Sequence, residues 1–137
     1  MKKIYSTIDP SLLLHQIVRL ADITNEQHEL SNPKEFLQIR AMNLGRNRTF
    51  AAHKHIWKNG VDKMITQESW IIIKGQVRGV FYDTDHQIIA DEVLEPGDCA
   101  ITFQGGHGLT SLADNTIMYE IKTGPYQGRE KDKTDIE

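Results

Sequence analysis

The sequence predicts an all-β protein, and two observations lead to that fold class. From residue 36 to residue 123 the chain divides into about eight short segments in which apolar and polar residues alternate, as in half-buried strands. Turn-forming residues separate these segments about every eight to twelve residues, as at Gly45-Arg46-Asn47 and Glu95-Pro96-Gly97-Asp98, and no helical pattern stands between them. This arrangement is typical of a β-sandwich or a β-barrel.

The two ends of the chain differ from this central region. Asp9-Pro10 has the form of a helix N-cap followed by proline, and apolar residues then recur at helical spacing as far as Leu20. Residues 1–35 are therefore predicted to form a short N-terminal helix and a loop outside the β domain of residues 36–123. Residues 124–137 are polar and charged, and we expect this tail to be mobile after Gly128.

The composition limits the class of protein. A chain of 137 residues with 39% apolar residues forms one domain with a modest core. The formal net charge of −3, without a basic cluster, argues against a nucleic-acid partner. The N-terminus lacks the apolar core of a signal peptide and no apolar run matches a membrane span, so we expect no membrane association. The single cysteine, Cys99, indicates a reducing, cytoplasmic environment, and we expect its side chain to be buried.

Three histidines and one glutamate are candidate metal ligands. His53 and His55 are one residue apart, so in a strand both side chains point to the same face, about 7 Å from each other. Glu68 on a neighbouring strand can supply a carboxylate oxygen, and His107 follows a later glycine turn. Divalent first-row metals accept this donor set, and iron, manganese, nickel and zinc are the candidate ions. The alternative is a hydrogen-bonded polar cluster without metal.

The same residues resemble the motifs of the cupin superfamily. Its first motif reads G-x5-H-x-H-x3,4-E-x6-G, and here His53-x-His55 is followed by Glu68, six further residues and Gly75. Its second motif reads G-x5-P-x-G-x2-H-x3-N, and the stretch from Gly97 to His107 falls close to it. The resemblance covers roughly residues 36–123. It implies a single cupin jelly-roll β-barrel that holds a metal ion through His53, His55, Glu68 and His107.

The chain departs from the first motif in one spacing. Twelve residues separate His55 from Glu68, where the motif has three or four, and this predicts an inserted loop from about residue 56 to residue 66 at the barrel mouth. Asn47, Phe103 and Ser111 also replace motif residues.

Three other stretches, residues 55–60, 67–70 and 122–126, resemble a small group of cupins that is associated with bacterial surface-polysaccharide gene clusters. The resemblance implies a small-molecule ligand such as a sugar derivative.

These observations predict a metal-dependent isomerase or epimerase that acts on a small polar molecule. Four protein ligands leave one or two positions open on a five- or six-coordinate ion, where a carbonyl or hydroxyl oxygen can be polarised. Two alternatives remain open: a non-catalytic module that binds a metal or a sugar, and an iron-dependent dioxygenase. No general base beyond the ligands is identified from the sequence. A second acid or base near the metal would favour an enzyme, and a purely apolar pocket would favour a binding module.

Other residues have two possible roles. Arg40, Arg46, Arg48 and Arg78 either hold a carboxylate or phosphate at the barrel mouth or are exposed surface charges. Trp70 and Tyr119 are expected to pack in the core. The apolar strand from Ser69 to Lys74 is expected to be buried on both faces. If the N-terminal helix does not cover its Ile71/Ile73 side, a second copy of the chain would, which favours a homodimer.

Overall fold

The computed structural model describes residues 1–58 and 64–136, and within these ranges it contains strands and short 3-10 helices but no α-helix. None of its helices is long and apolar enough to cross a lipid bilayer. The strands are β1 Lys2–Tyr5, β2 Leu13–Ile17, β3 Gln27–Glu29, β4 Leu37–Leu44, β5 Thr49–His55, β6 Glu68–Lys74, β7 Val77–Tyr82, β8 Ile88–Leu94, β9 Cys99–Thr102, β10 Gly106–Ser111, β11 Thr116–Thr123 and β12 Lys133–Asp135. The 3-10 helices are η1 Leu20–Asp22 and η2 Arg129–Lys131.

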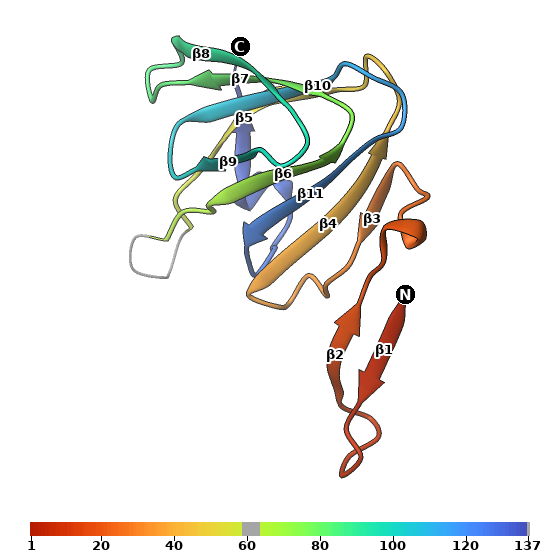
Figure 1. Cartoon of the computed structure of the whole chain (residues 1–137). Helices are drawn as coiled ribbons and strands as arrows, with labels where there is room; N and C mark the ends of the chain where they lie inside the picture. The colour runs from red at the N-terminus through yellow and green to blue at the C-terminus, as the bar shows by residue number, and fades with distance from the viewer. Residues whose placement is uncertain (59–63, 137) are drawn as a thin grey trace.

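Two five-stranded antiparallel sheets form the body of the molecule (Figure 1). One has the strand order β12-β5-β10-β7-β8 and the other the order β3-β4-β11-β6-β9. Side chains from both sheets meet in the core, among them Met42 and Met118 of one sheet and Val77 and Leu109 of the other. The all-β prediction is confirmed. The predicted barrel is corrected, because among the described residues no strand of one sheet pairs with a strand of the other, so the sheets do not close.

Strand β6 is buried on one face only, which corrects the prediction of a strand buried on both. Glu68, Trp70 and Ile72 alternate inward and are buried, whereas Ile73 points outward and is 36% exposed. Its neighbour β9 is the edge strand of the sheet, and Cys99 at its start is exposed rather than buried. An edge strand has a partner on one side only, so less of its surface is covered.

The predicted N-terminal helix is wrong, because residues 2–17 form a β-hairpin. Strand β1 pairs with β2 from Lys2↔Ile17 to Tyr5↔Leu13. Asp9-Pro10 lies in the connecting turn, where the Leu12 amide donates to the Asp9 carbonyl at 3.0 Å. Proline suits the second position of such a turn as well as the first turn of a helix, so the same dipeptide was compatible with both.

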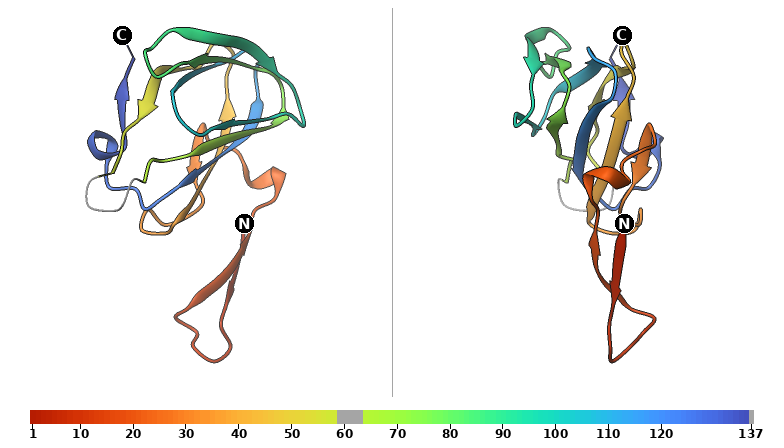
Figure 2. Two further views of the ribbon diagram at one scale, coloured as in Figure 1. Left: turned by 90° about the vertical axis from the view of Figure 1, so that its left-hand side faces the viewer. Right: turned by 45° about the vertical axis from the view of Figure 1, so that its right-hand side comes forward.

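The hairpin extends away from the two sheets in every view (Figures 1 and 2). Its turn and strands carry exposed apolar side chains, of which Ile8 at 95% exposure is the extreme case. The chain that follows returns to the body, where Ile23, with Val18 and Leu30, packs on Ala41 and neighbouring residues of the β4/β11 sheet.

The prediction that the tail is mobile after Gly128 is wrong for residues 129–135, which contain η2 and strand β12. Strand β12 pairs antiparallel with β5, from Lys133↔His55 to Asp135↔His53. This pairing places residues of the tail beside the two histidines of β5. The inserted loop predicted for residues 56–66 lies partly outside the described residues, and on its flanks Trp57 and Ile65 form a β-bridge.

Candidate metal centre

The four predicted ligands come together from three strands. His53 and His55 lie on β5, and His107 lies beside His53 on the neighbouring strand β10. Glu68 begins β6 in the opposite sheet. All four residues are buried, and one nitrogen or oxygen atom from each lies within 4.8 Å of the other three. The group is therefore compact enough to hold a metal ion.

Hydrogen bonds at Nδ1 orient each imidazole ring. Backbone carbonyl oxygens only accept, so Nδ1 of His53 and His55 carries a proton and Nε2 is the nitrogen available to a metal. The three Nδ1 contacts are His53 to the Ala51 carbonyl at 3.0 Å, His55 to the Asp132 carbonyl at 3.3 Å and His107 to Thr102 Oγ1 at 3.0 Å.

The Nε2 atoms of His55 and His107 point toward Glu68. His55 Nε2 lies 3.2 Å from Glu68 Oε2, and His107 Nε2 lies 3.4 Å from Glu68 Oε1. The His107 Nε2 atom is fully buried and has no hydrogen-bond partner among the described residues. A buried ring nitrogen without a partner is costly, and a metal ion would satisfy it. The residues therefore fit a divalent metal ion by donor chemistry and by this unsatisfied atom.

The charges of the cluster balance one another. Burial opposes ionisation of Glu68, but His107 and His55 outweigh it and hold the pKa of Glu68 well below its usual range. Burial likewise opposes the charged form of His55, yet Asp132 and Glu68 raise its pKa to about 9. Burial, followed by the nearby His107, lowers the pKa of His53 to about 4. A metal bound at these nitrogens would release the proton of His55.

Asp132, in the tail, supports the ring of His55. Its carboxylate Oδ2 lies 3.4 Å from His55 Nδ1, and Thr66 Oγ1 donates to its Oδ1 at 2.6 Å. Burial raises the pKa of Asp132, but hydrogen bonds from His55 and Thr66 outweigh it and bring the pKa to about 2. In metal sites, a carboxylate commonly lies beside the ring nitrogen of a ligand histidine that does not bind the metal.

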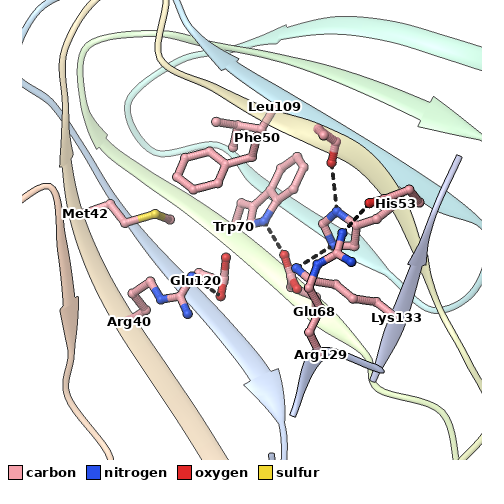
Figure 3. Close-up of a pocket in the computed structure, with 12 residues that line it drawn as sticks. Arg40, Met42, Phe50, His53, Glu68, Trp70, Leu109, Glu120, Arg129 and Lys133 are labelled. Atoms are coloured by element: carbon pink, nitrogen blue, oxygen red, sulfur yellow. Dashed lines mark hydrogen bonds and ion pairs between the residues drawn. The ribbon is translucent and has the colours of Figure 1, made fainter. Parts of the chain in front are cut away.

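A cavity of about 190 Å³ opens onto the cluster at His53 and Glu68 (Figure 3). One part of its wall is apolar and includes Phe50 and Trp70. The Trp70 indole also donates to Glu68 Oε1 at 2.7 Å, so it both packs in the core, as expected, and orients a candidate ligand. The remaining wall is charged and is formed by Arg40, Glu120, Arg129, Lys133 and Asp135.

Glu120 is an acid–base group that the sequence analysis missed. Arg40 Nη1 lies 3.5 Å from its Oε1, and its side chain is only 13% exposed. Burial raises the pKa of Glu120 to about 7; the negative charge of Glu68 adds to this shift and Arg40 opposes it. Alternation along β11 contained a signal for this residue. If Ile117 and Tyr119 face one way, Glu120 faces the other, toward the space between the sheets.

The four arginines that the sequence offered as candidate anion-binding residues lie in different environments in the structure. Arg40 lines the cavity. Arg48 and Arg78 form surface ion pairs, and Arg46 is exposed. The cationic residues of the tail, Arg129 and Lys133, were not anticipated, because a short polar segment without periodicity gives no indication of where it packs.

No family model matches this sequence. No curated protein matches it either. Solved structures do match, among them a cupin superfamily protein from Desulfitobacterium hafniense, with a TM-score of 0.53 and 13% identity over 71% of this chain and 74% of that one. The fold is that of the cupins.

Two further structures support this cupin fold. An uncharacterized conserved protein with a double-stranded β-helix domain from Klebsiella pneumoniae aligns with a TM-score of 0.63 and 14% identity, over 90% of this chain and 99% of that one. Oxalate decarboxylase from Bacillus subtilis aligns with a TM-score of 0.58 and 16% identity, over 75% of this chain and 24% of that one. This chain thus spans about a quarter of that enzyme. The resemblance to cupins is confirmed at the level of the fold.

Proposed function

We propose that this cupin-fold chain binds one divalent first-row metal ion through His53, His55, Glu68 and His107 and acts as an isomerase or epimerase on a small sugar derivative. One observation carries the proposal: two of the four ligands, His53 and Glu68, line a cavity together with Glu120, a largely buried carboxylate that is not itself in the cluster. An acid–base group beside the metal ligands is the feature that favours an enzyme over a binding module.

The metal, when bound, supplies a Lewis acid that polarises a carbonyl or hydroxyl oxygen of the substrate. Glu120 then provides the proton transfer. In an isomerisation its carboxylate takes a proton from the carbon next to the substrate carbonyl and returns it to the carbonyl carbon, while the hydroxyl proton moves to the former carbonyl oxygen. In an epimerisation the deprotonated substrate turns before Glu120 returns the proton to the opposite face of the same carbon. Isomerisation and epimerisation both need one such group to bind and release a proton in turn, and a pKa near neutrality suits both directions.

The remaining wall positions the substrate and limits access of water. Arg40 holds the carboxylate of Glu120 through their ion pair and is itself anchored by Glu29, whose Oε1 accepts from Arg40 Nε at 2.6 Å. Phe50 and Trp70 provide an apolar surface on which a sugar ring can pack.

The setting of this activity is also a proposal. The stretches that resemble cupins of surface-polysaccharide clusters support a sugar substrate and a role in polysaccharide biosynthesis. The single cysteine supports a cytoplasmic location. The exposed apolar hairpin and the exposed Ile73 support a homodimer, because surfaces of this kind are usually covered by a partner.

The first test is the metal content of untagged protein after reconstitution with iron, manganese, nickel or zinc. We expect about one ion per chain in the parent and a loss of metal in His53→Ala and His107→Ala. A parent that binds none of these ions would contradict the metal site.

The second test measures proton transfer directly. Metal-loaded protein is incubated in D₂O with a panel of aldoses, ketoses and sugar acids, and deuterium next to the carbonyl is followed by NMR. We expect exchange that Glu120→Gln slows by about 10²- to 10⁴-fold, with the metal retained. The control Glu92→Gln alters an exposed carboxylate on β8 and should leave exchange unchanged. Sugar binding without exchange would instead favour the non-catalytic binding module.

A further inference from the structure

Lys133 differs from the other two cations of the cavity wall, because among the described residues it forms no ion pair with a carboxylate. The guanidinium groups of Arg40 and Arg129 are each paired with carboxylates, namely Glu29 and Glu120 for the first and Asp135 for the second. Within residues 1–58 and 64–136, no carboxylate lies within ion-pair distance of the Lys133 ammonium. Its polar contact is with His53 Nε2, at 3.3 Å.

The position of Lys133 is set by the backbone. Strand β12 pairs with β5 so that the Cα atom of Lys133 is opposite that of His55. Side chains alternate along a strand, which places Lys133 and Asp135 on the cavity side and Thr134 on the other. Figure 3 shows the Lys133 side chain reaching His53 beside Glu68, while Arg40 and Glu120 lie on the opposite side of Glu68.

The contact with His53 is incompatible with a bound metal. An ammonium group has only donors, so Lys133 donates to the Nε2 lone pair of His53, which is the same lone pair that a metal ion requires. When a metal takes that lone pair, the ammonium loses its partner while it remains half-buried at the cavity wall. A buried cation without a partner is costly, so the loaded site favours a ligand that brings a negative charge.

We propose, building on the proposed function, that the substrate is an acidic sugar derivative and that Lys133 binds its carboxylate. Arg129 offsets Asp135, and Arg40 offsets one of its two carboxylate partners, Glu29 and Glu120. A divalent ion and one free ammonium still exceed the negative charges of Glu68 and Glu120, so the loaded cavity attracts an anion. One unpaired cation matches one carboxylate. A phosphoryl group, with three charged oxygens, is usually held by several donors. Lys133 is thus the residue that selects acids over neutral sugars.

The test compares probes that differ at one carbon. Cobalt(II)-loaded protein is titrated by calorimetry with D-glucuronate, with D-glucose, which lacks the carboxylate, and with D-glucose 6-phosphate. The variants are Lys133→Gln and Lys133→Arg, and Lys131→Gln serves as a control because it removes an exposed lysine from the same segment. Cobalt content and circular dichroism are recorded for every variant.

We expect the parent to bind D-glucuronate more tightly than either other probe. Lys133→Gln should weaken D-glucuronate binding about 10- to 100-fold, as for loss of a charged hydrogen bond, and should leave D-glucose binding unchanged. Lys133→Arg should restore most of the affinity, and Lys131→Gln should have no effect. Cobalt should be retained in Lys133→Gln, because the lysine competes with the metal for His53 Nε2.

The inference is overturned if the parent shows no preference for D-glucuronate over D-glucose, or if it binds D-glucose 6-phosphate more tightly than D-glucuronate. It is also overturned if Lys133→Gln binds D-glucuronate as tightly as the parent does. Loss of cobalt in Lys133→Gln would also overturn it, by showing a structural role. Failure of the parent to bind cobalt would instead contradict the proposed function. The two failures are therefore distinguishable.

Discussion

The interaction between Asp132 and His55 offers a sensitive test of the metal centre. The Asp132 carboxylate has two polar partners, since its Oδ1 accepts from the Thr66 hydroxyl at 2.6 Å and its Oδ2 forms an ion pair with His55 Nδ1 at 3.4 Å. Asparagine has nearly the same shape but only one acceptor oxygen and no charge. In Asp132→Asn one of the two donors therefore faces an amide NH₂ group.

The size of the effect follows from the pKa of Asp132, which is about 2 in the folded protein against an ordinary value of 3.8. Because the folded state favours the ionised form, the carboxylate stabilises the protein by about 2 kcal/mol at pH 7. This contribution is present above about pH 4 and is lost as the pH falls toward 2. The raised pKa of His55 reflects the same ion pair, so its effect is not added to this stabilisation. Removal of a carboxylate that orients a metal-ligating histidine lowers metal affinity about 10- to 100-fold.

Two measurements check these values. Urea unfolding of metal-free protein should show a loss of about 2 kcal/mol in Asp132→Asn at pH 7 and a much smaller difference near pH 2. Competition with a chelator of known affinity should show weaker metal binding. The control is Glu130→Gln, which removes an exposed carboxylate from the same segment. Unchanged metal affinity in Asp132→Asn would refute the supporting role of this residue, and an equal effect in Glu130→Gln would attribute it to net charge.

Three other results are expected. The pKa of Glu120 is raised to about 7, so its contribution to the free energy of unfolding of metal-free protein should fall by about 3 kcal/mol between pH 4.5 and pH 7, a dependence absent from Glu120→Gln. Gly75→Ala should lower the free energy of unfolding in urea by about 2–4 kcal/mol, because φ is +80° and a Cβ would lie 2.9 Å from Thr116 Cα. Gly97→Ala should lower it by less, because φ there is +98° but no atom lies within 4 Å of the added Cβ. Light scattering should show a dimer that Ile8→Asp weakens at least about tenfold, a monomeric parent being the contrary result.

The sequence allowed the strands and the candidate ligands to be predicted because both depend on local spacing. Alternation of apolar and polar residues, together with the apolar run of β6, identified most of the strands from β4 to β11, and the pair His53-x-His55 placed two imidazoles on one face whatever the rest of the fold. Gly75 belongs to the same local pattern, since its positive φ at the turn after β6 accounts for a glycine at the end of the first motif.

The hairpin at the N-terminus shows where local spacing fails. Leu13, Leu14 and Ile17 repeat as on an amphipathic helix, yet they lie on a strand that is exposed at all three positions. Apolar residues on an exposed hairpin do not follow the alternation that burial against a core imposes. Neither the helical nor the strand periodicity therefore indicated the structure of this segment.

The charged wall of the cavity could not be predicted for a different reason. Asp132 and His55 are 77 residues apart, and the described part of the tail that carries Asp132 and Lys133 contains only a short 3-10 helix and a three-residue strand. Pairing of that strand with β5 is a tertiary event without a sequence signature. It brings a carboxylate to the ring of one histidine and an ammonium group to the ring of another. The C-terminal segment is thus part of the site: it holds His55 in orientation, and through Lys133 it sets the charge that a ligand of the metal-loaded cavity must carry.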